Sequence, residues 1–173
     1  MGEKRALLIL NMQNDFVFEG GAMTVPGAEA LVPRIGALAS EFRERQEPVI
    51  YLCDTHDEDD PEFQHARPHA LRETIGAEVI EDLDPQPGDY IIEKTTWSGF
   101  FGTTLEEVLR DEAVDDLVLT GVCTNRCVHY TAADAAMRGY GIEVPEETTA
   151  ARDPGAGKYA LKQIREILRP RRS

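Results

Sequence analysis

Residues 119–140 read LTGVCTNRCVHYTAADAAMRGY, and the rest of the chain can be organised around this stretch. The apolar run from Asp116 to Thr120 leads into it and has the length of a buried strand. A glycine turn follows, and small residues along one side of 125–138 predict a helix. Cys123 lies in the turn and Cys127 in the first helical turn. The stretch therefore predicts strand, turn and helix, with two thiols where the helix begins.

A thiol at a helix N-terminus is suited to nucleophilic chemistry. The free backbone N–H groups and the positive end of the helix dipole favour the thiolate, which is the form that attacks carbonyl carbons. The same N–H groups can stabilise an oxyanion. The alternative is that both cysteines are small buried apolar residues, as most free cysteines are.

Length and composition predict one globular domain spanning 1–173. The chain has 42% hydrophobic and 29% charged residues, which is enough for a substantial core. It has three cysteines, an odd number without framework spacing, which predicts reduced thiols and a cytoplasmic protein. No apolar stretch is long enough for a signal peptide or a membrane span.

The net charge of −14 restricts the partners. Excess acid repels nucleic acid and anionic membranes, so we expect neither as a partner. The acidic, lysine-poor composition also resembles that of proteins from a high-salt cytoplasm, and an ordinary acidic surface is the alternative. Stability measured against salt concentration would separate these two interpretations.

Strand-length apolar runs alternate with amphipathic segments along the chain. This alternation predicts an α/β fold with a parallel sheet covered by helices on both faces. The further predicted strands are 5–11, 48–54, 89–93 and a short 141–145, and the further predicted helices are 28–45, 104–111 and 158–168. The segment 55–88 is long, irregular and acidic, and it carries three histidines.

Chemically active side chains follow four of the predicted strands. Asp15, Asp54, Lys94 and Cys127 each come shortly after one, and right-handed crossovers place the ends of parallel strands at one edge. Asp15 could take the proton of Cys127, and Lys94 could stabilise the thiolate and hold Asp15. Taken singly, an Asp after a strand is more often a loop cap, and a Lys there is more often a surface charge.

A second set could hold a metal ion. Asp54 and His56 form a D-x-H pair that presents two ligands on one side of an extended segment, and His69 could complete three ligands with open positions. The alternative is a chance pair in an acidic loop.

Three motifs, in order, carry a resemblance to a known family. NMQNDF, IEKTTWSGFFGTTLEEVL and LTGVCTNRCVHYTAADAAMRGY resemble the isochorismatase-like cysteine hydrolases, over about residues 5–144. Within that family the D-x-H pair and the following Pro68-His69 are most similar to the nicotinamidases.

The resemblance implies a three-layer αβα fold with a Rossmann-like parallel sheet of five to six strands. It also implies an Asp–Lys–Cys triad of Asp15, Lys94 and Cys127. The backbone N–H groups of Cys123 and Cys127 would form the oxyanion hole, and the peptide bond before Cys123 would be cis.

The resemblance further implies a divalent metal ion, zinc with manganese or iron as alternatives, on Asp54, His56 and His69. Nicotinamidases usually carry an aromatic residue three positions before the second metal histidine, and this position is Ala66 here. The ring slot would then need an aromatic side chain from elsewhere, for which the candidates are Phe16, Trp97 and Phe100.

These expectations predict a cysteine amidohydrolase, with nicotinamide as the first candidate substrate and NAD salvage as its setting. The small-molecule amide would be the partner, and the family resemblance implies a homo-oligomer. The alternatives are another small amide, such as an N-carbamoyl compound or ureide, a vinyl ether hydrolase of the isochorismate type, a non-catalytic binding protein of the same fold, and a thiol redox protein.

Overall fold

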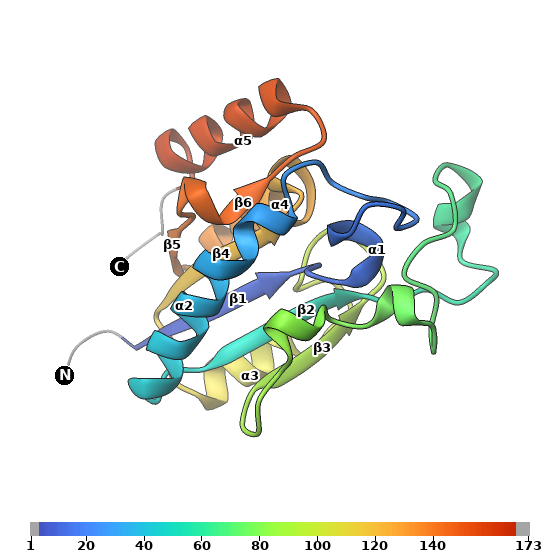
Figure 1. The fold of residues 1–173 in the computed structure, drawn as a ribbon. Helices are drawn as coiled ribbons and strands as arrows, with labels where there is room; N and C mark the ends of the chain where they lie inside the picture. The colour runs from blue at the N-terminus through green and yellow to red at the C-terminus, as the bar shows by residue number, and fades with distance from the viewer. Residues whose placement is uncertain (1–3, 169–173) are drawn as a thin grey trace.

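Six parallel strands form the centre of the computed structural model, which describes residues 4–168 (Figure 1). The order is β3-β2-β1-β4-β5. The short strand β5 pairs with the start of β4, and β6 pairs with the end of β4 on the same side. All five pairings are parallel, so every strand ends at the same edge. The strands are β1 (Arg5–Leu10), β2 (Val49–Asp54), β3 (Tyr90–Lys94), β4 (Asp116–Val122), β5 (Gly141–Glu143) and β6 (Thr149–Ala150).

Helices cover both faces of the sheet. Side chains on alternate positions of β1 and β2 pack against α2 on one face and against α3, α4 and α5 on the other. Figure 1 shows α2 crossing the near face and α3 behind the sheet. The helices are α1 (Asn14–Val17), α2 (Val32–Glu44), α3 (Leu105–Asp111), α4 (His129–Met137) and α5 (Pro154–Glu166).

The two central strands are buried because both their faces are covered. In β1, Leu7 and Ile9 pack into the α2 side of the core, while Leu8 and Leu10 pack into the other side. All four are at most 1% exposed. This double burial explains why the strand is a continuous apolar run rather than an alternating one.

The long segment between β2 and β3 has no extended secondary structure, but it is ordered by short turns. It contains three 3₁₀ turns, η2 (Pro61–Gln64), η3 (Ile75–Ala77) and η4 (Glu81–Leu83). Its η3 turn lies beside α1 near the ends of β1 and β2, and its η4 turn packs beside α2 (Figure 1). Further turns are η1 (Glu29–Leu31), η5 (Thr124–Val128) and η6 (Glu146–Thr148).

The predicted fold class is confirmed: a parallel sheet of six strands lies between helical layers. The structure adds β6, whose two residues are too few to give a periodic signal. The predicted helix over 125–138 is a π-helical turn, η5, continued by α4. The single-domain bounds 1–173 stay a prediction, since 1–3 and 169–173 lie outside the described residues.

None of the helices in residues 4–168 combines the length and the apolar composition needed to cross a membrane.

Candidate active site

Cys127 lies at the sheet edge because β4 turns directly into a helix there. Gly121 makes this possible: it has φ of 102°, and a side chain would collide with the main chain of Leu10 on the neighbouring strand. The peptide bond between Val122 and Cys123 is cis, as the family resemblance implied. The chain then winds into η5, where the N–H of Val128 donates to the carbonyl of Cys123 at 3.3 Å. Such π turns are frequent at functional sites.

Two nitrogen donors contact the sulfur of Cys127, which is 5% exposed. Lys94 Nζ lies 3.4 Å from Sγ, and Asn11 Nδ2 lies 3.2 Å from it. Lys94 Nζ also donates to the carbonyl of Thr96 at 3.0 Å and forms an ion pair with Asp54 Oδ1. The Lys94 ammonium therefore lies between a sulfur and a carboxylate.

The electrostatics of this cluster keep the thiol protonated at rest. Burial raises the pKa of Cys127 to about 11, and the ammonium of Lys94 only partly opposes this. Burial also disfavours the charge on Lys94, but Asp54 and the Cys127 sulfur raise its pKa above the usual lysine value. Lys94 is thus a permanent cation near neutral pH, and the thiol needs a proton acceptor before it can attack.

Asp15 is not that acceptor in this structure, and the predicted triad needs this correction. Its Oδ1 accepts from the N–H of Ala22 at 3.1 Å, and its Oδ2 accepts from the N–H of Ala70 at 2.8 Å. Lys94 pairs with Asp54 instead. The physical reason is that Asp15 lies in the first turn of α1, several residues beyond the end of β1. Its carboxylate faces loop backbone rather than the sulfur.

Asn11 occupies the place beside the sulfur that was predicted for an acid. It directly follows β1, and its left-handed φ of 52° is one that asparagine tolerates. Its Nδ2 donates to Asp54 Oδ2 at 3.1 Å as well as to Cys127 Sγ. Its Oδ1 is buried without a partner among the described residues. An amide cannot accept a proton from a thiol, so sequence reasoning that looked for an acid passed over this residue.

Gln13 was also missed, and it holds Asp54 in place. Its Oε1 accepts from the N–H of Asp54 at 2.9 Å, and its Nε2 donates to the carbonyl of Asp54 at 2.7 Å. The side chain is fully buried. The sequence alone does not show that a polar residue beyond a strand end is buried, because its hydrogen-bond partner lies on another strand.

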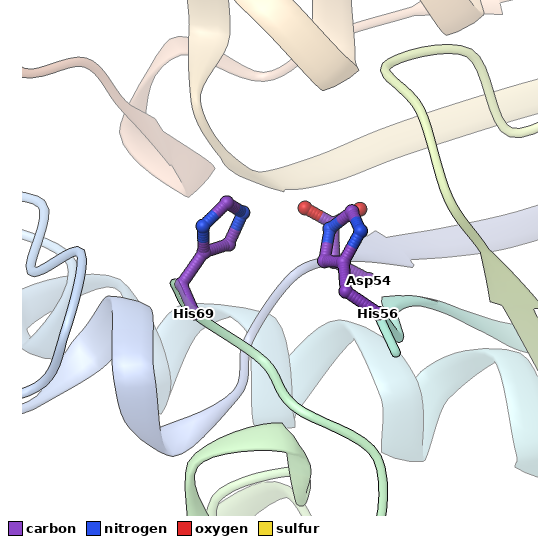
Figure 2. A group of neighbouring side chains, drawn as sticks. All are labelled: Asp54, His56 and His69. Carbon is purple, nitrogen blue, oxygen red and sulfur yellow. The ribbon is translucent and has the colours of Figure 1, made fainter. Parts of the chain in front are cut away.

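The predicted metal ligands do come together. Each of Asp54, His56 and His69 offers a ligand atom, and these atoms lie within 4.8 Å of one another. All three side chains are buried. Figure 2 shows them facing one another, with His69 arriving from a separate stretch of the loop.

The histidines are oriented as metal ligands are. His56 Nδ1 contacts Asp60 at 3.0 Å, and His69 Nδ1 contacts the carbonyl of Arg67 at 2.8 Å. These contacts leave each Nε2 free to bind a metal, which is the usual supporting arrangement. His56 Nε2 is a buried atom without a hydrogen-bond partner among the described residues. A divalent cation would satisfy it, so these residues fit a metal site.

Glu62 is a further candidate ligand that the sequence did not single out. Its carboxylate lies 4.0 Å from His56 Nε2 and 3.9 Å from His69 Nε2. In an acidic loop one glutamate cannot be distinguished from its neighbours by pattern. His65, the third histidine of the segment between β2 and β3, is exposed.

The aromatic residues divide into two groups. Phe16 and Trp97 line the same pocket as Cys127, and Phe16 makes an edge contact with the His69 ring at 5.6 Å between centroids. Phe100 does not belong there: it packs in the core beside Tyr140, with the guanidinium of Arg138 over its ring. The prediction that Phe100 forms part of the pocket is wrong, because the turn after β3 points it under the sheet.

The pocket that Cys127 faces is small. It has a volume of about 30 Å³, and its lining includes Cys123, Asp54 and His69. A wider hollow of about 470 Å³ adjoins it and shares Glu62, Trp97 and Arg126 with it. The arrangement offers a buried thiol, a charged relay and a candidate metal site within one recess. The oxyanion role of the two cysteine N–H groups stays a prediction.

Known proteins share this fold and about a third of its sequence. Residues 5–170 match the family model described as Isochorismatase domain. Nicotinamidase/pyrazinamidase PncA from Bacillus subtilis superposes with a TM-score of 0.91 at 33% identity, covering 95% of this chain and 96% of that one. N-carbamoylsarcosine amidase from Thermoplasma acidophilum superposes with a TM-score of 0.86 at 38% identity, covering 93% and 92%.

Two further relatives bear on the metal and on activity. A pyrazinamidase of Pyrococcus horikoshii, whose structure is a complex with zinc, is 28% identical with a TM-score of 0.90 and covers 96% of this chain and 97% of its own. An Arabidopsis thaliana protein described as a probable inactive nicotinamidase is 34% identical over 86% of this chain and 82% of its own length.

Proposed function

Because the chain belongs to the isochorismatase family of hydrolases, we propose that it is a cysteine amidohydrolase that cleaves a small amide. The observation that carries this proposal is the buried Cys127 thiol in contact with Lys94, whose other side meets Asp54. Few structural roles explain a fully buried ammonium next to a thiol. Burying such a charge is costly unless it is paired, and here the ammonium contacts the thiol that lines the pocket.

Asp54 takes the role that the sequence analysis gave to Asp15. Lys94 contacts both Cys127 and Asp54, so it can pass a proton to the Asp54 carboxylate while it takes the proton of the thiol. The net transfer is from sulfur to carboxylate, and Lys94 stays an ammonium. The resulting thiolate keeps two hydrogen-bond donors, from Lys94 and Asn11. These donors offset the burial that opposes its charge.

The thiolate then attacks the carbonyl carbon of the amide. The N–H groups of Cys123 and Cys127 stabilise the oxyanion, as expected at the start of a helix. The leaving nitrogen takes back the proton held on Asp54, the C–N bond breaks, and ammonia departs. Water hydrolyses the thioester and releases the acid with the thiol restored. Asn11 lines this pocket, and its buried Oδ1 is an acceptor without a partner among the described residues.

His56 and His69, with Glu62 beside them, would hold a divalent cation such as zinc together with Asp54, whose Oδ1 stays paired with Lys94 and leaves the other carboxylate oxygen as the ligand. When bound, it would act as a Lewis acid near the substrate and lower the pKa of water. Phe16 orients the His69 ring and narrows the pocket.

Nicotinamide and N-carbamoyl compounds are the two candidate substrates. Relatives named for each reaction superpose over more than nine-tenths of this chain. If nicotinamide is the substrate, the enzyme belongs to NAD salvage. Either substrate is compatible with a cytoplasmic enzyme. We expect the active form to be a homo-oligomer.

Ammonia release from nicotinamide, pyrazinamide and N-carbamoyl compounds tests the proposal. We expect Cys127→Ala to reduce turnover by about 1,000-fold or more, because it removes the nucleophile. Cys123 contributes only its backbone N–H, which alanine also has, so Cys123→Ala should keep much of the activity. The reverse ranking would overturn the assignment of the nucleophile.

A non-catalytic binding protein is the second candidate, and Asn11 is the observation that favours it. The residue beside the sulfur is an amide that cannot accept a proton. The Asn11→Asp variant places a carboxylate at the same position. If wild type is inactive and this variant releases ammonia, the wild-type chain is the binding protein. If wild type is active, the relay through Lys94 suffices.

A further inference from the structure

The segment between β3 and α3 carries two groups that face the site. The carbonyl of Thr96 accepts a hydrogen bond from Lys94 Nζ at 3.0 Å, and the ring of Trp97 lines the same pocket as Cys127. Residues 95–104, all within the described part of the chain, form neither helix nor strand. The position of the segment therefore depends on hydrogen bonds that it makes with neighbouring elements.

Two hydrogen bonds fasten this segment to α4. The Ser98 hydroxyl donates to Asp134 Oδ2, and the N–H of Gly99 donates to the Thr131 hydroxyl at 2.9 Å. Both acceptors belong to the helix that continues from the turn holding Cys127, roughly one and two turns beyond it. The segment is thus attached to the same helix that carries the sulfur.

A second partner holds the Asp134 carboxylate in place. Its Oδ1 accepts from Arg138 Nη1 at 2.8 Å. Arg138 also pairs with Glu106 on α3, and its guanidinium carbon lies 4.7 Å from the centre of the Phe100 ring. A hydrogen bond from a hydroxyl to an ionised carboxylate is stronger than one between neutral groups. The contact between Ser98 and Asp134 is therefore a charged hydrogen bond within a supported network.

Trp97 depends on such support because burial alone does not fix its ring. The side chain is 45% exposed and stacks on Tyr130, with ring centroids 5.0 Å apart. It lines both the inner pocket and the wider hollow, so its ring lies where the two adjoin. In an inner pocket of only about 30 Å³, a small displacement of this ring changes the space that is left for a substrate.

We propose that Ser98 and Asp134 are positioning residues, whose hydrogen bond holds the Trp97 ring against the pocket of Cys127. Neither residue is part of the pocket lining, so each acts through Trp97 rather than on the substrate. The effect on turnover rests on the proposed amidohydrolase function. The position of the ring does not, because it can be measured without any reaction.

Trp97 is the only tryptophan in the chain, so tryptophan fluorescence reports on its ring alone. Ser98→Ala should lower the fluorescence anisotropy and increase quenching by acrylamide, because a released ring moves faster and is easier to reach. Asp134→Ala should have the same effect. Ser98→Thr keeps the hydroxyl and Asp134→Asn keeps an acceptor, so both should stay close to the wild-type values.

Kinetics test the effect on the reaction, using whichever of nicotinamide, pyrazinamide and N-carbamoylglycine wild type hydrolyses fastest. Ser98→Ala should lower kcat/KM by about 10- to 100-fold, mostly through KM, as expected when a group that lines the pocket is misplaced. Ser98→Thr should recover most of this loss. The double variant of Ser98→Ala with Asp134→Ala should lose no more than Asp134→Ala alone, since both changes remove the same hydrogen bond.

Ser40→Ala is the matched control. The Ser40 hydroxyl also donates a hydrogen bond, to the carbonyl of Gly36, but it lies in α2 outside the pocket lining. This variant should leave fluorescence and kinetics unchanged. A Ser98→Ala protein with wild-type anisotropy and quenching would overturn the proposal. A ring that is released without any change in KM would overturn it too.

The two readouts separate this proposal from the proposed function. If wild type hydrolyses none of the three amides, the hydrolase assignment fails, and the fluorescence of Ser98→Ala still decides whether the hydrogen bond holds the ring. If wild type is active and Ser98→Ala matches it in both readouts, the hydrolase assignment stands and the positioning role is wrong. Chemical denaturation verifies that each variant is folded before either readout is taken.

Discussion

Two carboxylates follow neighbouring parallel strands at the same sheet edge, yet their surroundings differ. Asp15, after β1, accepts hydrogen bonds from the backbone N–H groups of Ala22 and Ala70. Asp54, at the end of β2, faces a buried ammonium and the amide of Asn11. The first joins two loop segments to α1, and the second is the charged centre of the site.

The difference shows that proximity to a strand end does not by itself make an acid functional. Asp54 is the last residue of its strand and pairs in register with Lys94 on β3. Asp15 lies after a turn, in α1. The sheet register holds Asp54 opposite Lys94, and it sets the distance between these two groups on neighbouring strands.

The largest expected contrast comes from neutralising each acid. Asp54→Asn should lower turnover by about 100-fold or more, since it removes the proton acceptor. It also leaves the Lys94 ammonium buried without its counter-charge, which should lower the free energy of unfolding by about 3–5 kcal/mol. Asp15→Asn should cost about 1–3 kcal/mol through weakened hydrogen bonds and keep most of its turnover per folded molecule. Chemical denaturation and ammonia release measure the two effects. Equal losses of turnover would remove the distinction.

Metal binding should follow the Asp54 side of the comparison. We expect the purified protein to bind about one zinc ion per chain, as a site of this ligand set does. His56→Ala and His69→Ala should each lower the affinity for zinc by at least about 10- to 100-fold, which is the loss seen when a residue that only supports a ligand is removed. The exposed His65→Ala is the control and should keep full zinc content by elemental analysis. Zinc retained by the His56 and His69 variants would contradict the assignment.

Reactivity of the sulfur gives a third contrast. With the pKa of Cys127 raised to about 11, alkylation by iodoacetamide should be slow at pH 7 and should accelerate about tenfold per pH unit below that value. Because the Asp54 charge raises the pKa of Cys127, Asp54→Asn should move this profile to lower pH. Asp15→Asn should not move it. Mass spectrometry of the Cys127 peptide follows the reaction, and a profile that is flat from pH 6 would mean that the thiolate is already present.

The smallest effect concerns the support of Asp15. Gly76 in η3 lies against the Asp15 carboxylate, so a methyl group there would collide with it. Gly76→Ala should lower the free energy of unfolding by about 1–3 kcal/mol without changing kcat. Gly36→Ala within α2, where the added methyl makes only an ordinary contact with Leu83 at 3.6 Å, should be neutral or slightly stabilising. A fall in kcat for Gly76→Ala would connect Asp15 to catalysis after all.

The fold was largely predictable from sequence because buried parallel strands leave a direct signal. The runs at Arg5–Leu10 and Val49–Asp54 are apolar on both faces, and the structure contains both strands. The candidate metal cluster was foreseeable because a D-x-H pair keeps its geometry locally, and only His69 needs the fold to bring it near. Phe100 was misplaced because the direction of a side chain after a strand depends on the turn that follows.

The sequence by itself determined the α/β class, the order of the elements and the thiol at the mouth of a helix, since periodicity and turn residues act over short distances. Only the tertiary structure decided which polar groups meet the sulfur. Asp54 and Lys94 end two strands, while Asn11 and Cys127 lie just beyond the ends of two others, and their contacts depend on how these strands are ordered in the sheet. It also decided that Asp15 supports a loop and that Ser98 meets Asp134 on α4. Such contacts join residues far apart in the chain, where no local pattern records them.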